Sequence, residues 1–197
     1  MRASHLLGIS LLPALSAALP GLRQTSHSAS HFQARRIGRV NVADVADAQF
    51  NFLPYELADV CLDCSRPSSQ AQYSCGLNFD WYDPNSRLEN NVTSCHCSYT
   101  WSWDGVTPIQ ADGEYVTCFK QGSTLFEMKI LDFQSGHNLT LDMGHHYKDS
   151  TNFSYPWIYP TTFSTPQLSL PLRILGNNSM TYYDAGPIFA NITQLSD

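Results

Sequence analysis

The side chains best suited to chemistry in this 197-residue sequence are six cysteines, which all fall between positions 61 and 118. An even number of cysteines favours disulfide bonds if the chain reaches an oxidising compartment. A zinc centre is the alternative, because Cys61-x-x-Cys64 has knuckle spacing and Cys95-His96-Cys97 offers further ligands. Only one residue separates Cys95 from Cys97, which is not knuckle spacing. Disulfides are therefore preferred, and no metal ion or cofactor is expected. The six are Cys61, Cys64, Cys75, Cys95, Cys97 and Cys118.

The spacing of the cysteines restricts their pairing without fixing it. On a strand, Cys95 and Cys97 point to the same face two residues apart, and their Cβ atoms are then too distant for a good disulfide. Each of them is therefore expected to pair with one of the other four cysteines. The connectivity stays open, because the sequence does not choose among the possible pairings.

Two adjacent histidines, His145 and His146, are the next candidates for chemistry. Neighbouring residues on a strand face opposite sides, so these two side chains cannot bind one ion together. His145 shares its strand face with Met143 and Tyr147. A packed or surface histidine is therefore preferred to a metal ligand.

Several carboxylates fall near predicted strand ends, where a two-carboxylate glycosidase site can assemble. They are Asp80, Asp83, Asp104, Asp112 and Glu114. Turn positions favour Asp for conformational reasons, and that interpretation is preferred here. The sequence contains no HExxH, GxSxG or glycine-rich phosphate loop. No catalytic residue is assigned, and the chain is interpreted as a non-enzyme.

Aromatic side chains are the other candidates for function. Trp101 and Trp103 share a predicted strand face with Cys95 and Cys97. Because cysteines are usually buried, we expect the two tryptophans to lie in the core and not on a sugar-stacking surface. Aromatic residues in or beside predicted loops are better candidates for a partner-contacting surface. These are Tyr82, Trp157, Tyr159, Tyr182 and Tyr183.

The elements that must position these residues are strands. From Tyr73 to Trp81 the odd positions are apolar and the even positions polar, and the same alternation runs from Thr93 to Trp103. The turn chemistry of Asp83-Pro84-Asn85-Ser86 follows the first run. The two runs are therefore expected to pair as an antiparallel hairpin or meander.

Further short strands are predicted along the rest of the chain, and no window shows a helical period. The run 125–133 changes face near Leu131, which indicates a bulge, and Pro171 favours an edge position for the run 168–174. Residues 149–166 are interpreted as a long loop. With 114–120, 139–143 and 187–195 added, seven to nine strands predict an all-β fold, an antiparallel β-sandwich or β-barrel stapled by disulfides.

The N-terminal residues have the pattern of a secretory signal. Arg2 precedes an apolar stretch, and small residues follow, which predicts a signal peptide over 1–18. Residues 19–47 are interpreted as a pro-segment or disordered leader. The dibasic Arg35-Arg36 step permits processing, and an uncleaved tail is the alternative. Residues 48–197 are expected to form a single β domain, secreted and extracellular.

Five asparagine sequons support the same destination, because chance predicts about two in a chain of this composition. They predict glycosylation at Asn91, Asn138, Asn152, Asn177 and Asn191. Removal of residues 1–36 leaves seven Lys and Arg against 17 Asp and Glu, a formal charge of −10. Nucleic acid and membrane surfaces are therefore not expected as partners.

Several segments have a distinctive strand texture and spacing, namely Tyr73-Ser-Cys-Gly-Leu-Asn-Phe, Asp83-Pro-Asn, Cys97-Ser-Tyr-Thr-Trp101, Tyr115-Val-Thr-Cys118, Phe126-Glu-Met-Lys129 and Asn138-Leu-Thr-Leu-Asp-Met-Gly-His145. In these segments the sequence resembles the fungal major-allergen-like family of secreted β-barrels, which includes candidate plant-interaction effectors. The resemblance covers about residues 70–195 and implies a fungal extracellular protein without established enzymatic activity.

Two functions from different classes follow from these observations. The first is a secreted non-enzymatic interaction protein, an effector or allergen-like protein that binds a host protein or a cell-wall component. The second is a secreted carbohydrate-active protein, either a sugar-binding module or a two-carboxylate hydrolase.

Overall fold

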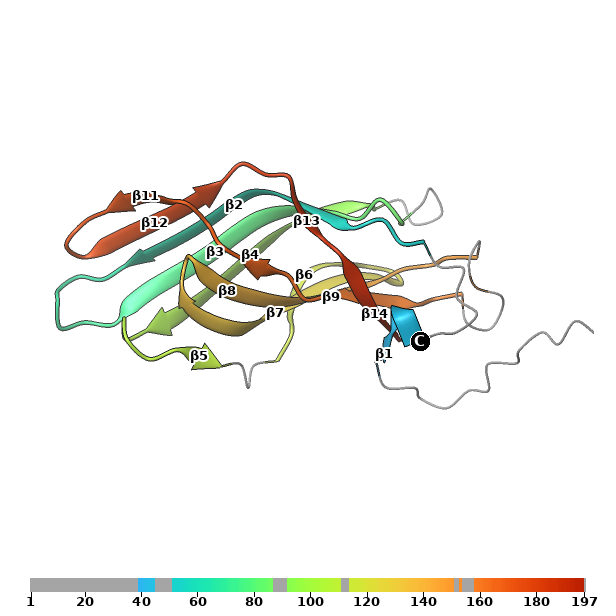
Figure 1. The fold of residues 1–197 in the computed structure, drawn as a ribbon, viewed down its shortest axis with the longest axis horizontal. Helices are drawn as coiled ribbons and strands as arrows, with labels where there is room; N and C mark the ends of the chain where they lie inside the picture. The colour runs from blue at the N-terminus through green and yellow to red at the C-terminus, as the bar shows by residue number, and fades with distance from the viewer. Residues whose placement is uncertain are drawn as a thin grey trace, which may run out of the picture. The chain divides into compact units, whose positions relative to one another are not determined.

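Each of two sheets contains one long antiparallel hairpin, residues 73–103 in the first and 124–146 in the second (Figure 1). The computed structural model describes residues 39–44, 51–86, 92–110, 114–150, 153 and 158–196. All of them belong to the second of two units, residues 35–197. The expected signal peptide, 1–18, lies outside the described residues. No helix among the residues described is long and apolar enough to span a membrane.

The first sheet has six strands and follows the order β11-β12-β2-β3-β4, with β13 also paired to β2. Its odd-numbered positions in β3 point inward and are buried, because the alternation seen in the sequence places the apolar side chains on one face. The strands are β2 (Tyr55–Ser65), β3 (Tyr73–Tyr82), β4 (Ser94–Trp103), β11 (Leu172–Leu175), β12 (Ser179–Asp184) and β13 (Ile188–Ala190).

The second sheet has eight strands and follows the order β1-β14-β9-β8-β7-β5, with β10 paired to β8 and β6 to β7. A register shift between Ile130 and Asp132 confirms the bulge expected near Leu131. The strands are β1 (Val40–Asn41), β5 (Ile109–Gln110), β6 (Val116–Gln121), β7 (Thr124–Ser135), β8 (Asn138–His146), β9 (Thr161–Ser164), β10 (Gln167–Leu168) and β14 (Ile192–Ser196).

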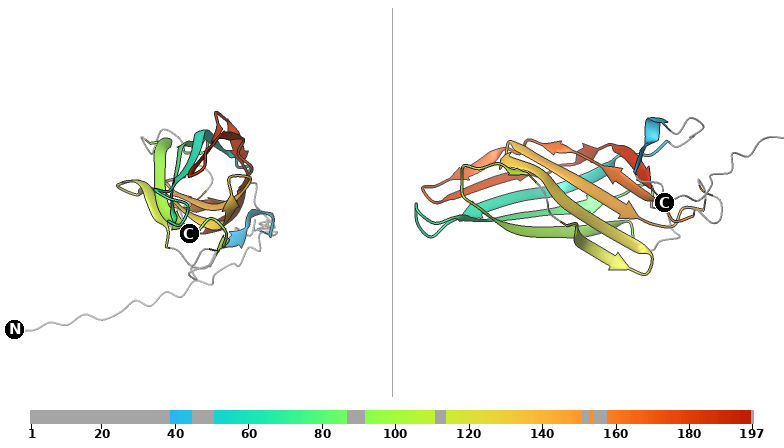
Figure 2. Two further views of the ribbon diagram at one scale, coloured as in Figure 1. Left: turned by 90° about the vertical axis from the view of Figure 1, so that its left-hand side faces the viewer. Right: turned by 90° about the horizontal axis from the view of Figure 1, so that it is seen from below.

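The hydrophobic core lies between the two sheets, which enclose it when viewed along the strands (Figure 2, left). Trp81 has no exposed surface and contacts Tyr55 of its own sheet and Phe126 of the other, with ring centroids 5.1 and 4.9 Å apart. Trp103 is buried and Trp101 is packed against the core, as expected for their face of β4. Aromatic side chains of the two sheets are therefore in contact across the core.

Two disulfides staple this arrangement. Cys64 and Cys75 are register partners on β2 and β3 and point inward. Cys97 on β4 bonds Cys118 on β6, so the second disulfide ties the edge of one sheet to a strand of the other. The prediction of an all-β, disulfide-containing, sandwich-like fold is confirmed. Among the described residues, the only helical element is a 3-10 turn, Val42–Asp44.

Details of the predicted strands were wrong in four places. The expected single strand 168–174 is two strands in different sheets, β10 paired to β8 and β11 paired to β12. Fourteen strands lie within the described residues instead of seven to nine, because six of them have four residues or fewer and are too short to show alternation. The expected loop 149–166 contains β9. The expected single strand 187–195 is two strands, β13 and β14, and the chain passes from one sheet to the other at Asn191.

The expected start of the domain at residue 48 also lies too far along the chain. Val40 and Asn41 pair with Leu195 and Gln194 of β14, so residues from the expected leader are part of the eight-stranded sheet. Arg39 is anchored as well, because its guanidinium lies 2.6 Å from the Asp142 carboxylate and 3.6 Å from the centroid of the Phe163 ring. A two-residue strand has too little pattern to be predicted from sequence.

Candidate functional site

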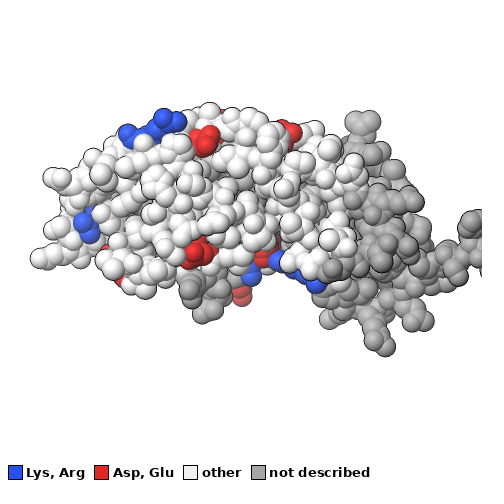
Figure 3. All heavy atoms as spheres, in the orientation of Figure 1, with Lys and Arg blue, Asp and Glu red and all other residues white. Residues whose placement is uncertain are grey.

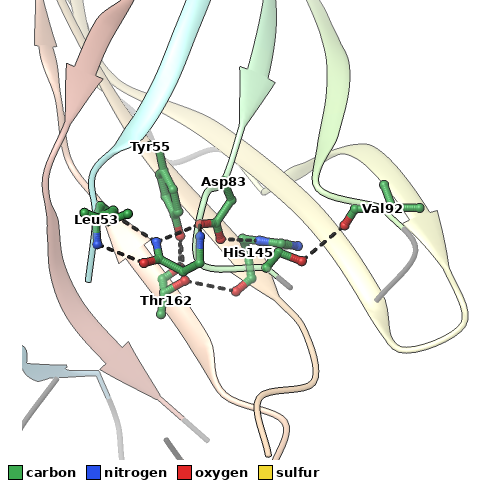
Figure 4. A network of polar contacts seen from close by, with 8 residues as sticks. Leu53, Tyr55, Asp83, Val92, His145 and Thr162 are labelled. Carbon is green, nitrogen blue, oxygen red and sulfur yellow. Dashed lines mark hydrogen bonds and ion pairs between the residues drawn. The ribbon is translucent and has the colours of Figure 1, made fainter. Parts of the chain in front are cut away.

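A buried acid–base pair lies where the two sheets meet at one end of the core (Figure 4). Asp83 directly follows β3. Its Oδ2 atom and the Nδ1 atom of His145, on β8, lie 2.6 Å apart and share a hydrogen bond. Neither side chain has any exposed surface. The His145 ring is stacked on Phe126, with centroids 3.7 Å apart, and also lies against Tyr147. Of the two alternatives expected, a packed or a surface histidine, His145 is the packed one.

A network of polar contacts holds this pair in place (Figure 4). The other oxygen of Asp83 accepts hydrogen bonds from the backbone and side-chain amides of Asn85, which closes the turn expected from the sequence. Asn85 in turn makes two hydrogen bonds with the backbone of Leu53. The Tyr55 hydroxyl bonds the backbone and side-chain oxygens of Thr162, which ties the first sheet to β9.

The chemistry available to this pair is limited by its burial. Burial lowers the pKa of His145, and the hydrogen bond and charge of Asp83 only partly oppose that effect. Burial also raises the pKa of the nearby Tyr55 hydroxyl, and the charge of Asp83 adds to it. A general base must come within hydrogen-bonding reach of its substrate. Because neither Asp83 nor His145 reaches the surface, we assign the pair a structural role.

Three of the carboxylates near strand ends, Asp80, Asp83 and Asp104, have different surroundings in the part of the chain that the structure describes. Asp83 points into the core, whereas Asp80 points outward and pairs with His96, the two side chains being 58% and 62% exposed. Asp104 caps its own turn through the amides of Val106 and Thr107. Asp112 lies outside the described residues. No group of three or more metal-binding side chains occurs among the residues described.

The expectation that all six cysteines form disulfides is met for four of them. Cys61 and Cys95 are free thiols. Cys61 faces outward on β2 and Cys95 faces inward on β4, with β3 between them, so these two cannot bond each other. Burial is the main cause that raises the pKa of Cys61 to about 11 and of Cys95 to about 12, with contributions from Asp63 and Asp80 respectively. Both thiols are therefore poorly reactive at neutral pH.

A second candidate site is the outward side of the six-stranded sheet, which we call the hydroxyl face. Its residues come into line through the strand register. Ser179, Ser65, Ser74 and Ser102 form one row across four strands, and Thr181, Asp63, Gly76 and Thr100 form the next. The face consists of Glu56, Ala58, Cys61, Asp63, Ser65, Ser74, Gly76, Asn78, Asp80, Tyr82, Ser94, His96, Ser98, Thr100, Ser102, Ser179, Thr181, Tyr183 and Phe189.

Many hydroxyl groups of this face have no hydrogen-bond partner among the residues that the structure describes. Thr181 bonds Asp63, and Tyr183 bonds Asp59, where a positive φ marks a bulge in β2. Other hydroxyls make no side-chain hydrogen bond to any part of the chain that the structure describes, and their residues are exposed. These are Ser65, Ser74, Ser94, Ser98, Thr100 and Ser102.

Two aromatic side chains stand at one end of the hydroxyl face. Phe189 pairs with Glu56, and Glu56 pairs with Tyr82, so the three residues form one row across β13, β2 and β3. Phe189 is 60% exposed and Tyr82 is 41% exposed. Two exposed aromatic rings in one row of a polar sheet face are candidates for contact with a partner.

The five aromatic residues expected to contact a partner have different positions. Tyr82 and Tyr183 lie on the hydroxyl face, and Tyr159 is exposed beside His146 on the other sheet. Tyr182 is a correction, because it is buried. It points inward, and its ring packs so closely on Gly136 of the β7–β8 turn that a Cβ there would come within 2.2 Å. Trp157 lies outside the described residues.

The predicted glycosylation sites that the structure describes lie in turns or at strand ends. Asn177 lies in the β11–β12 turn, Asn191 lies between β13 and β14, and Asn138 begins β8 and accepts a hydrogen bond from Gln167. None of these three belongs to the hydroxyl face. Asn91 and Asn152 lie outside the described residues.

Two functional features escaped prediction from the sequence. Asp83 and His145 are 62 positions apart, and no local pattern joins them. The hydroxyl face depends on the register between strands, although the polar alternate positions of β3 and β4 carried part of its signal. Phe189 was missed because its strand has only three residues.

The fold and its surface define a disulfide-stapled antiparallel β-sandwich with a polar, partly aromatic sheet face. Comparisons of the chain with protein-family models, with curated proteins and with solved structures found no match. The two disulfides suggest an extracellular or otherwise oxidising compartment.

Proposed function

We propose that this chain is a secreted, non-enzymatic binding protein that contacts an extracellular partner through the hydroxyl face. The observation that carries the proposal is the contrast between its two polar sites. The Asp83–His145 pair is sealed in the core, whereas six hydroxyls and two aromatic rings on the sheet face are open to solvent. Binding requires an accessible surface, and this face supplies one.

Extracellular action is supported by three independent features. Two disulfides staple the sheets, the first 18 residues have the pattern of a signal peptide, and five sequons exceed the number expected by chance. The described sequons lie in turns or at strand ends, and none of their asparagines belongs to the hydroxyl face. In the view of Figure 3, charged side chains are scattered over a largely uncharged surface.

The resemblance to fungal secreted β-barrels indicates where the partner would be found. It supports an effector or allergen-like role, in which the partner is a host protein or a component of the cell wall. A carbohydrate-hydrolysing role is not proposed, because the outward Asp80 and the buried Asp83 do not form an accessible pair.

The proposal is tested by covering the hydroxyl face with a glycan. Ser98→Asn forms an acceptor sequon with Thr100 on exposed β4, and expression in a glycosylating host would place a bulky glycan on the face. Gly122→Asn forms a matched sequon with Thr124 on the other sheet, at a positive φ that Asn tolerates and where a Cβ meets nothing within 4 Å. The double change Ser98→Asn with Thr100→Ala lacks the sequon and serves as a second control.

Each immobilised protein is exposed to extracellular fluid and cell-wall fragments from plant tissue. We expect the wild type and both controls to retain the same material, and Ser98→Asn to lose it. Equal retention by all four proteins would contradict the proposed use of this face.

A further inference from the structure

We infer that the hydroxyl face binds a neutral, extended polysaccharide of β-linked sugars, an inference that rests on the proposed function of this face. The first argument is the regular array of donors and acceptors. Neighbouring strands lie ~4.8 Å apart, and successive outward residues of one strand lie ~6.7 Å apart. A row such as Ser179, Ser65, Ser74 and Ser102 therefore offers hydroxyls at regular intervals to the hydroxyls of an extended sugar chain.

The second argument is the spacing of the aromatic rings. Phe189 and Tyr82 flank Glu56 in one row, so their backbones are two inter-strand distances apart, about 10 Å. That separation is close to the length of a disaccharide unit in an extended β-linked chain. Sugar rings carry apolar C–H faces that pack on aromatic side chains, and the Glu56 carboxylate between them can accept hydrogen bonds from neighbouring sugar hydroxyls.

The third argument is charge. The rows of the hydroxyl face carry acidic side chains, and none of their members is Lys or Arg. An uronate, sulfated or phosphorylated polymer would be repelled by this arrangement. The acidic members are Glu56, Asp63 and Asp80.

A protein partner fits this face less well. The centres of protein interfaces are enriched in aromatic, Met and Arg side chains and depleted in Ser. The middle of the hydroxyl face has small polar residues, with Asn78 and Ser98 in one row and Gly76 and Thr100 in the next. The exposed rings of Phe189 and Tyr82 lie in the row of Glu56, and Tyr183 lies on β12 in the row of Asn78 and Ser98.

The test uses insoluble β-1,3-glucan, cellulose and chitin, with polygalacturonate as an anionic polymer. Depletion of the purified full chain from solution measures binding to each. We expect saturable binding to at least one neutral polymer and none to polygalacturonate. Tyr82→Ala and Phe189→Ala should each weaken the binding about tenfold, the size expected for loss of one aromatic contact. Glu56→Gln keeps the size and hydrogen-bonding capacity of the side chain and should weaken binding less than Glu56→Ala.

Tyr159→Ala is the matched control, because Tyr159 is 40% exposed, almost the same as Tyr82, but lies beside the other sheet. It should leave binding unchanged. Thermal unfolding of every variant separates loss of binding from loss of fold. Failure to bind any neutral polymer, or binding unaffected by Tyr82→Ala and Phe189→Ala, would overturn the inference. If the polymers fail while the Ser98→Asn glycan still abolishes capture of extracellular material, the proposed function stands and only the polysaccharide is wrong.

Discussion

Asp83 and His145 meet in the core with Oδ2 and Nδ1 2.6 Å apart, although 62 positions separate them in the sequence and neither side chain is exposed. An exposed counterpart exists in the same protein, because Asp80 and His96 pair at 2.8 Å on the hydroxyl face. The buried Asp83–His145 pair therefore joins the two sheets, whereas the exposed Asp80–His96 pair is accessible to a partner. This contrast allows matched experiments.

Breaking the buried pair is expected to destabilise the fold. Asp83→Asn should lower the free energy of unfolding by about 3 kcal/mol, because it removes the charge from a hydrogen bond inside the core. Asp80→Asn, in the exposed pair, should cost less than about 1 kcal/mol. Urea unfolding at neutral pH measures both. Equal losses for the two variants would contradict the structural role of Asp83.

Acidification is expected to destabilise the protein through His145. Burial lowers the pKa of His145 below its ordinary 6.5, so the unfolded chain takes up a proton at a higher pH than the folded chain. The free energy of unfolding should therefore be fully present above about pH 6.5 and fall as the pH drops from there towards the lowered pKa. His146, whose pKa is lowered by burial and by His145, adds to the same trend.

Urea unfolding between pH 7.5 and 5 measures this dependence. His145→Gln should flatten it, and His146→Gln should remove a smaller part. A wild-type profile that is flat or rises on acidification would count against the assignment.

Denatured protein should contain two free thiols, those of Cys61 and Cys95. In the native state both should react slowly with thiol reagents at pH 7, because their pKa values are raised to about 11 and about 12. Joint replacement of Cys97 and Cys118 by Ala should cost about 3 kcal/mol of stability, as expected for closing a loop of this length. Six reactive thiols in the unfolded protein would show that the sheets are not stapled.

The N-terminal boundary can be tested by truncation. A chain that begins at Ile37, the product of cleavage after Arg36, retains Arg39 and β1. We expect it to match the stability of a chain that begins at Leu19. A chain that begins at Val45 loses the Arg39–Asp142 ion pair and the β1–β14 pairing, and should unfold at a lower temperature. Equal melting temperatures for all three would mean that the leader adds nothing to the fold.

The sequence predicted the long strands and missed the short ones for a physical reason. β3 and β4 have ten residues each, enough for alternation to appear, whereas β9 and β13 have four and three. Tyr182 was expected to contact a partner, but Gly136 leaves room for its ring in the core, and that contact joins β12 to the β7–β8 turn. The polar positions of β3 and β4 were visible, but their alignment with β2 and β12 required the register.

The central claim is that a partner covers the hydroxyl face, and the reaction of two histidines with diethyl pyrocarbonate tests it most directly. His96 lies on that face, and His137 lies in the exposed turn between β7 and β8, so both are reporters within one molecule. Mass spectrometry then measures the modification rate of each with and without the captured partner. The account predicts that the partner slows modification of His96 and leaves His137 unchanged. Protection of His137 with His96 still reactive would place the binding surface elsewhere.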